Sequence, residues 1–156
     1  MIVPAAGLFA AVAAWALLAD APKPGGHWTA FKTAFVTAEG RVKDTGNGGI
    51  SHSEGQGFAM LLATHHHDRK AFDGLWTWTQ QNLGVRADRL FAWKWVPDAA
   101  VAVPDLNDAA DGDLLIAWAL ARAGRRWESS DYTAAANAIA RDVLAKLVKR
   151  DRKSVV

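Results

Sequence analysis

The stretch Ile50–Ala63, ISHSEGQGFAMLLA, passes from polar and glycine-rich residues to apolar residues at helical spacing. It predicts a helix over residues 53–66 with Ser53 as its N-cap. Glu54 then lies in the first turn, and Gly55 and Gly57 leave open space beside its carboxyl group. A glutamate at this position commonly serves only to interact favourably with the positive end of the helix dipole. It is also held rigidly enough for acid–base chemistry, so the rest of the chain must decide between the two roles.

Four further helices are predicted around this one. They cover residues 27–38, a segment capped by Asp68 and closed by Gly84, the apolar run 114–123, and residues 130–149. The run 114–123 follows a loop in which Asp111 or a neighbour supplies the cap, and its apolar character on almost every side predicts burial. Residues 41–49 form a glycine-rich loop. We therefore expect an all-α fold with short connections.

Residues 90–96 break the helical pattern. Large and small residues alternate there and Pro97 follows, which predicts a short strand or extended loop with Phe91, Trp93 and Trp95 on one face. Eight tryptophans against one tyrosine is unusual. Indole rings fill cores, and they also form flat surfaces on which sugar rings stack. The sequence leaves both roles open for this segment.

The composition suits one domain of 156 residues with a formal charge of +2. The basic residues are scattered, which argues against a nucleic-acid partner. The chain has no cysteine, so it has neither disulfides nor thiolate metal sites. Adjacent histidines at His65–His67 point in different directions on a helix and suit its last turn, so neither they nor His52 predict a metal site. No cofactor is expected.

The first 21 residues are predicted to be a secretory signal peptide. Ile2–Leu18 is uncharged and apolar, and Ala19-Asp20-Ala21 fits a small-x-small cleavage site. Residues 22–27 would form a linker. Export to the periplasm or the medium is expected. Because no Lys or Arg precedes the apolar run, an uncleaved membrane anchor is the alternative.

Glu54 and Asp111 each open a predicted helix. If these helices run parallel, both carboxyl groups lie at the same end of the helical array. Cleavage of a glycosidic bond needs a protonated carboxylic acid for the leaving oxygen and a second carboxylate for the other half of the reaction. A helix N-terminus favours the ionised form of a carboxyl group, so burial or a neighbouring charge must counteract it in a general acid.

Two motifs resemble glycoside hydrolase family 8. They are Ser53–Met60 (SEGQGFAM) and Asn107–Leu120 (NDAADGDLLIAWAL). The similarity is nearest to the endoglucanases found alongside bacterial cellulose synthase. It extends in order from about residue 28 to residue 144, and includes the loop 40–44, the helix 72–82 and the segment 92–95.

The resemblance implies part of an (α/α)6 barrel, about half of the toroid, over residues 28–150, with an atypical tail at 151–156. It implies inverting endo-hydrolysis of β-1,4-glucan, with Glu54 as proton donor and Asp111 positioning the sugar at the cleavage point. Candidate substrate-binding residues are Trp93, Trp95, Gln56, Phe58 and Asp113. The family's base aspartate has no match in this chain. A non-catalytic glucan-binding remnant, or an inactive fragment, is therefore the alternative.

The same resemblance sets the expected partners. These are a β-glucan, whether cellulose, mixed-linkage glucan, xylan or chitosan, and the bacterial cellulose-synthesis machinery. An incomplete barrel would leave one apolar side of the helix 114–123 uncovered, which favours self-association.

Overall fold

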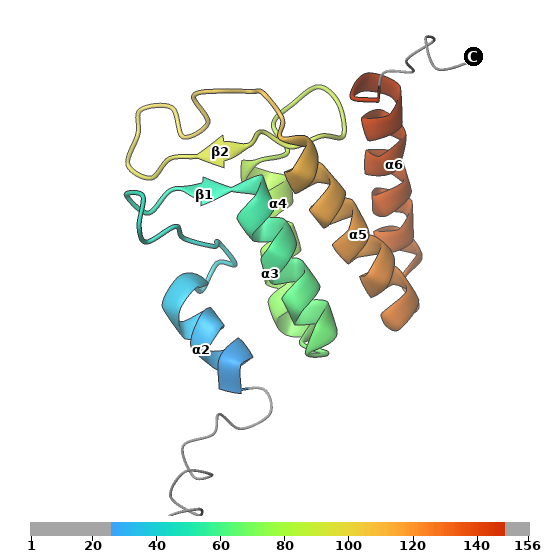
Figure 1. Cartoon of the computed structure of the whole chain (residues 1–156), viewed down its shortest axis with the longest axis horizontal. Coiled ribbons are helices and arrows are strands. Elements are labelled where there is room, and N and C mark those ends of the chain that lie inside the picture. The colour runs from blue at the N-terminus through green and yellow to red at the C-terminus, as the bar shows by residue number, and fades with distance from the viewer. Residues whose placement is uncertain (1–25, 149–156) are drawn as a thin grey trace, which may run out of the picture.

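The computed structural model describes residues 26–148. The elements follow in the order α2 (Gly26–Phe35), β1 (Ser51–His52), α3 (Ser53–His65), α4 (Arg69–Asn82), β2 (Lys94–Trp95), α5 (Ala110–Arg126) and α6 (Ser130–Lys146). Figure 1 shows α3 and α5 side by side and running in the same direction, with α4 behind them and α6 beyond α5. The strands β1 and β2 lie at the end where α3 and α5 begin. The predicted all-α class is confirmed.

Most predicted helix boundaries agree with the structure to within a few residues. The first helix is the main exception at its C-terminal end, because Val36 leaves α2 to pair with Val42 in an antiparallel bridge. Residues 26 and 27, assigned above to a linker, are the first residues of α2. The helix predicted at 114–123 is longer in both directions. The signal peptide 1–21, the rest of the linker and the tail 151–156 lie outside the described residues.

Asp68 caps α4 as predicted. Its side chain accepts a hydrogen bond from the backbone N of Ala71 at 3.0 Å. It also accepts from Trp28 Nε1 at 3.0 Å and from Lys32 Nζ at 2.5 Å. One carboxylate therefore caps α4 and holds α2 against it.

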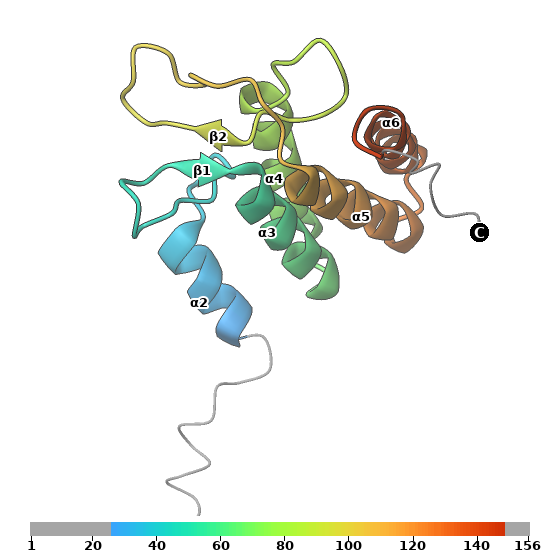
Figure 2. The same ribbon diagram turned by 45° about the horizontal axis from the view of Figure 1, so that its top comes forward.

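The prediction that Ser53 caps α3 is wrong. His52 is the N-cap and makes no side-chain capping bond, while Ser53 is the first residue of the helix. The reason is the sheet: β1 pairs antiparallel with β2, with Ser51 opposite Trp95, and the backbone N of Ser53 donates to the carbonyl of Trp93 at 3.0 Å. This pairing sets the angle at which the chain enters α3 (Figure 2).

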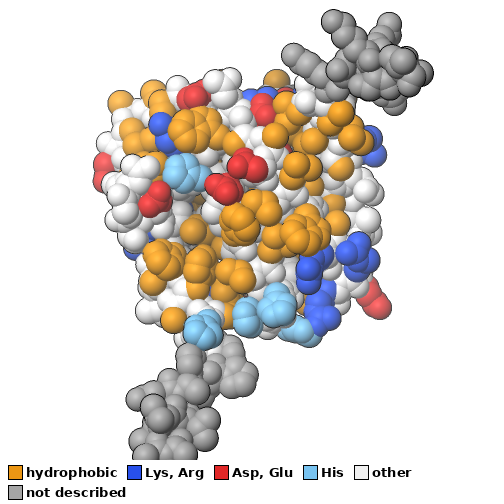
Figure 3. Space-filling model, viewed as in Figure 1, with side chains coloured by type: hydrophobic (Ala, Val, Ile, Leu, Met, Phe, Trp, Pro, Cys, Tyr) orange, Lys and Arg blue, Asp and Glu red, His pale blue; other side chains and the backbone are white. Residues whose placement is uncertain are grey.

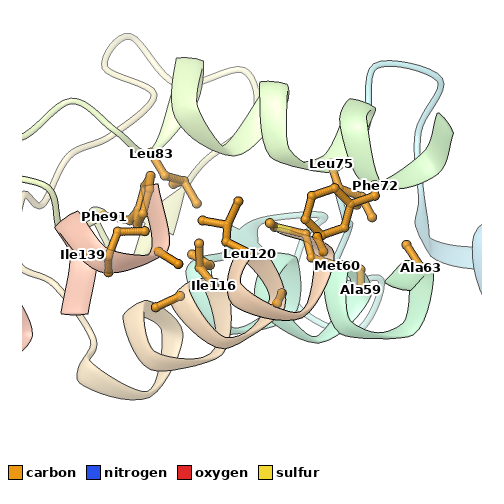
Figure 4. Close-up of a cluster of buried hydrophobic side chains, with 14 of the residues drawn as sticks. Ala59, Met60, Ala63, Phe72, Leu75, Leu83, Phe91, Ile116, Leu120 and Ile139 are labelled. Atoms are coloured by element: carbon orange, nitrogen blue, oxygen red, sulfur yellow. The ribbon is translucent and has the colours of Figure 1, made fainter. Parts of the chain in front are cut away.

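The core lies between α3, α4 and α5 and extends to α6. Figure 4 shows Met60, Phe72, Leu75, Ile116 and Leu120 pointing toward one another, and all five are fully buried. Burying a side chain of this size contributes roughly 1.5–3 kcal/mol. The core therefore fixes the spacing of the helices that carry Glu54 and Asp111.

The predicted burial of the helix 114–123 on every side is wrong for one face. Ile116 and Leu120 are fully buried, whereas Leu114 and Trp118 remain 54% and 53% exposed. The uncovered apolar side that the partial barrel predicts is thus present within residues 26–148. None of the helices in this range is long and apolar enough to cross a membrane.

Candidate active site

Two glycines bring the first turns of α3 and α5 together. A Cβ atom on Gly112 would lie 2.1 Å from Ser53 Oγ and 3.0 Å from the backbone N of Glu54. A Cβ on Gly57, farther along α3, would lie 2.6 Å from the Cβ of Leu115. Larger residues at either position would push the helices apart, because a packed interior does not absorb extra atoms. Glu54 and Asp111 therefore lie in neighbouring first turns at one end of the molecule.

Both carboxyl groups face solvent. Asp111 accepts a hydrogen bond from the backbone N of Gly112 at 2.8 Å, which fixes it within its own turn. The carboxyl group of Glu54 makes no hydrogen bond or ion pair to any other residue in the range 26–148. Two helix N-termini converge on this spot, so their unpaired N–H groups and positive dipole ends face the same space.

A shallow pocket opens beside Glu54. It has a volume of about 340 Å³ and is lined by Val42, Lys43, Asp44, His52, Glu54, Gly55 and Phe58. Asp44 and His52 lie 4.0 Å apart and can form an ion pair when the imidazole is protonated. Phe58 is half exposed and offers an apolar wall. Sequence reasoning missed Asp44 and His52. The available signal was their position in the glycine-rich loop and immediately before α3.

Trp93 lies next to this pocket. Its ring stacks on His52 with centroids 5.9 Å apart and an angle of 6° between the planes. Its Nε1 donates to Asp105 at 2.8 Å, and Lys94 Nζ lies 4.5 Å from the ring centroid. These contacts hold the indole in a defined orientation at the edge of the site.

Trp95 and Phe91 have different surroundings. Trp95 packs edge-on against Trp78 at 5.7 Å, with the Arg41 guanidinium 4.8 Å from its ring centroid. Phe91 is buried against Trp76. The expectation that Phe91, Trp93 and Trp95 share one face is wrong, because regular strand geometry is confined to Lys94 and Trp95.

Gln56 cannot contact a substrate in this structure, because its side chain is completely buried. Its Oε1 accepts from the backbone N of Val42 at 2.6 Å, and its Nε2 donates to Thr79 Oγ1 at 2.9 Å. The same Nε2 lies 3.2 Å from the Gly40 carbonyl. Gln56 thus anchors the loop that forms one wall of the pocket, and its expected role in direct substrate binding is corrected.

Asp113 is also completely buried, which corrects the same expectation for it. Its Oδ1 accepts from the backbone N of Phe91 at 2.9 Å, and no hydrogen-bond partner within residues 26–148 reaches its Oδ2. Burial raises the pKa of Asp113 to about 7, although the Phe91 bond acts in the opposite direction. The nearby charges belong to Asp108 and Asp88, which raise it, and Arg86, which lowers it.

The histidine triplet does not converge. His66 stacks on Trp28 with centroids 5.8 Å apart, while His67 has a positive φ of 59° and contacts Arg126. Within residues 26–148, no three side chains of His, Cys, Asp or Glu are placed to hold a metal ion.

Comparisons by sequence and by structure both find glycosyl hydrolases of family 8. The family model described as glycosyl hydrolases family 8 matches residues 1–153. An endoglucanase from Cellulomonas uda is 47% identical over 117 residues, which cover 75% of this chain and 33% of that protein. A probable endoglucanase from Novacetimonas hansenii is 48% identical over 118 residues, which cover 76% of this chain and 34% of that protein.

Two solved structures are similar in fold. The endoglucanase Cel10 from Klebsiella pneumoniae has a TM-score of 0.74 and 47% identity, covering 76% of this chain and 38% of that one. An endoglucanase from Komagataeibacter sucrofermentans has a TM-score of 0.78 and 44% identity, and the match covers 81% of this chain and 40% of that one. This chain therefore spans about a third of the length of the curated relatives it matches.

Proposed function

The chain belongs to glycosyl hydrolase family 8, its helices form part of an (α/α)6 barrel, and we propose that it carries the acid half of an inverting endo-β-1,4-glucanase site. In this proposal Glu54 is the general acid and Asp111 positions the sugar at the cleavage point. The observation that carries it is the contact of Gly112 with Ser53 and Glu54, which joins the two helix starts.

The geometry suits this division of roles. Glu54 is exposed at the rim of a pocket and has no partner within the described part of the chain, so its carboxyl group is free to reach a glycosidic oxygen. Asp111 is held by the Gly112 N–H. Phe58 lines the pocket and Trp93 stacks on His52, which also lines it, so both offer apolar surface of the kind on which sugar rings pack. A positioned acid contributes about 10²–10⁴-fold to the rate.

The base half of the reaction is not assigned to a nearby aspartate. Asp105 accepts from the Asn107 backbone and from Trp93, and these bonds lower its pKa, which weakens it as a base. Asp108 lies 3.1 Å from Arg86. Asp113 is buried. Because these aspartates are already bonded or buried, the second candidate function is binding of glucan through Trp93, without cleavage by this chain alone.

Replacing Glu54 by glutamine tests the proposal. In a full-length or reconstituted form that also supplies the base, we expect the release of reducing ends from carboxymethylcellulose to fall by at least about 100-fold, while tryptophan quenching by cello-oligosaccharides persists. Glu39→Gln is the matched control, because Glu39 is an exposed glutamate outside the pocket. Equal activity in Glu54→Gln and Glu39→Gln would contradict the assignment. Binding without any cleavage by the unaltered full-length or reconstituted form would support the second candidate.

Export is part of the same proposal, and its support is the apolar run Ile2–Leu18 with the small residues at 19–21. We expect the chain recovered from a bacterial periplasm or medium to begin near Pro22. Intact-mass measurement checks this. A membrane-bound chain that still begins at Met1 would favour the anchor instead.

A further inference from the structure

The loop 105–109 places the first turn of α5. The N-cap residue Ala109 makes no side-chain capping bond, so the direction in which α5 begins depends on how the preceding loop is held. The same loop supports the segment before β2, because the backbone N of Trp93 donates to the carbonyl of Asn107 at 2.9 Å. The position of the loop therefore affects both Asp111 and Trp93.

Trp93 connects this loop to α3. Its carbonyl accepts a hydrogen bond from the backbone N of Ser53 at 3.0 Å, and its ring stacks on His52. Ser53 is the first residue of α3 and immediately precedes Glu54. The loop, Trp93 and the start of α3 thus form one hydrogen-bonded series that reaches the residue proposed as the general acid.

The side chain of Arg86 holds the loop in place. Its guanidinium lies 3.1 Å from Asp108 Oδ1, and its Nη1 donates to the carbonyl of Leu106. The same group forms two bonds to Asp88, from Nε at 2.9 Å and from Nη2 at 3.0 Å. A guanidinium is a rigid, planar fork of donors, so the two bonds to Asp88 fix its plane and aim its other donors at the loop.

Arg86 lies among carboxyl groups that are mostly buried. On the face shown in Figure 3, acidic atoms lie mostly in the upper half, toward the end where α3 and α5 begin. The side chains of Arg86 and Asp108 are only 18% and 17% exposed. Burial raises the pKa of Asp113, and Arg86 is near enough to oppose that shift. Because solvent screens such charges little, the loss of Arg86 would leave like charges facing one another.

We propose that Arg86 is a positioning residue of the candidate site: it acts through the loop 105–109 on the first turn of α5 and on Trp93, without touching the substrate. This inference rests on the proposed function, because it concerns residues to which that proposal gives roles. A reacting group displaced by about 1 Å can lose about 100-fold in rate. The bonds of one guanidinium can therefore govern turnover although Arg86 does not line the pocket beside Glu54.

Lys146 offers a matched control. It bonds to the same partner, Asp88, at 2.8 Å, and to Asp142 at 3.4 Å. Among the residues that the structure describes, it makes no bond to the loop 105–109. Its side chain is 44% exposed, so its ion pairs contribute little. Removing Lys146 disturbs the group of carboxylates without releasing the loop, whereas removing Arg86 does both.

Hydrolysis of carboxymethylcellulose by a full-length or reconstituted form that also supplies the base tests the proposal. We expect Arg86→Met to lower kcat/KM at least about tenfold, and Lys146→Met to leave it within about twofold. Arg86→Lys keeps the charge but lacks the planar fork, so its kcat/KM should lie between these two. Amide hydrogen exchange at Trp93 should be faster in Arg86→Met than in Lys146→Met. Circular dichroism verifies that each variant is folded.

A second change separates positioning from general stability. Arg86→Met leaves Asp108 without its partner, and adding Asp108→Asn removes that stranded charge. The double variant should regain stability in urea unfolding but not kcat/KM, because the loop still lacks the guanidinium. It also carries the comparison, together with Arg86→Lys, where Arg86→Met alone does not fold. Recovery of kcat/KM along with stability would show a structural role only and overturn the proposal.

Two outcomes distinguish this inference from the proposed function. Faster exchange at Trp93 with unchanged kcat/KM in Arg86→Met would overturn the positioning role and leave the proposed function intact, as would equal losses in Arg86→Met and Lys146→Met. Unchanged activity in Glu54→Gln would instead overturn the proposed function, and with it the inference that depends on it.

Discussion

The buried carboxyl group of Asp113 should make the stability of this protein depend on pH in an unusual direction. Asp113 is fully buried, and one of its oxygens has no partner within residues 26–148. Its pKa is about 7 in the folded protein against 3.8 ordinarily. The folded protein therefore binds this proton more tightly than the unfolded chain does. Stability from this group is present at pH 4 and is lost as the pH rises toward 7.

The size of the effect follows from the same values. Each tenfold change in proton affinity is worth about 1.4 kcal/mol, so the shift corresponds to a loss of roughly 3 kcal/mol between pH 4 and pH 7. That is a large fraction of the roughly 5–15 kcal/mol that stabilises an ordinary domain. The hydrogen-bonded ion pair with Arg86 lowers the pKa of Asp88 far below its usual range. That contribution is lost as the pH falls, mainly below pH 4, and so lies largely outside this window.

Asp113→Asn isolates the contribution. An asparagine keeps an oxygen that accepts from the backbone N of Phe91 but cannot ionise, so it imitates the protonated form. We expect urea unfolding of the variant and of the unaltered protein to agree near pH 4, and the variant to be more stable by roughly 3 kcal/mol at pH 7. Asp131→Asn is the control, because it makes the same substitution at an exposed residue in the first turn of α6. A difference between Asp113→Asn and the unaltered protein that does not change with pH would refute the reasoning.

Four further substitutions test contacts in the site and in the fold that supports it. Gly112→Ala forces a Cβ to within 2.1 Å of Ser53 Oγ and should cost about 1–3 kcal/mol in urea unfolding. Gly55→Ala meets only Val42 at 3.8 Å and should leave stability equal or higher, and the reverse order would contradict the packing. Gln56→Leu removes the acceptor of the Val42 N–H and should cost roughly 2–4 kcal/mol with faster hydrogen exchange at Val42. Asp68→Ala removes the cap of α4 and should lower thermal stability by about 1–3 kcal/mol, and an unchanged melting temperature would show that the cap contributes nothing.

The helices could be predicted from the sequence because the residues that each buries in the core recur at helical spacing. Phe72, Leu75 and Thr79 on α4 follow one another at intervals of three and four residues, and all three are fully buried. The start of α3 could not be predicted in the same way. Its entry is set by pairing of Ser51 with Trp95, and contacts between residues far apart in sequence leave no local pattern.

The candidate site was predicted in part, and helical geometry explains which part. Successive residues of an α-helix are about 100° apart, so residues two positions apart lie on nearly opposite faces. Glu54 and Gln56 are two apart, as are Asp111 and Asp113; in each pair the first faces solvent and the second is buried. Because Gln56 and Asp113 lie so close in sequence to Glu54 and Asp111, all four were expected to contact the substrate. When Glu54 and Asp111 face outward, however, the polar residues two positions later must face the core. They bind backbone groups there, and so position the loops on which the outward pair depends.

The same geometry connects the site to exposed apolar side chains on α3 and α5, such as Phe58 and Trp118. Phe58 follows Glu54 by four residues and Trp118 follows Asp111 by seven, so each lies within about 40° of the carboxyl group that precedes it on the helix. The carboxyl groups proposed to act on the substrate and the exposed apolar side chains therefore share one face of α3 and α5 as a direct result of their spacing.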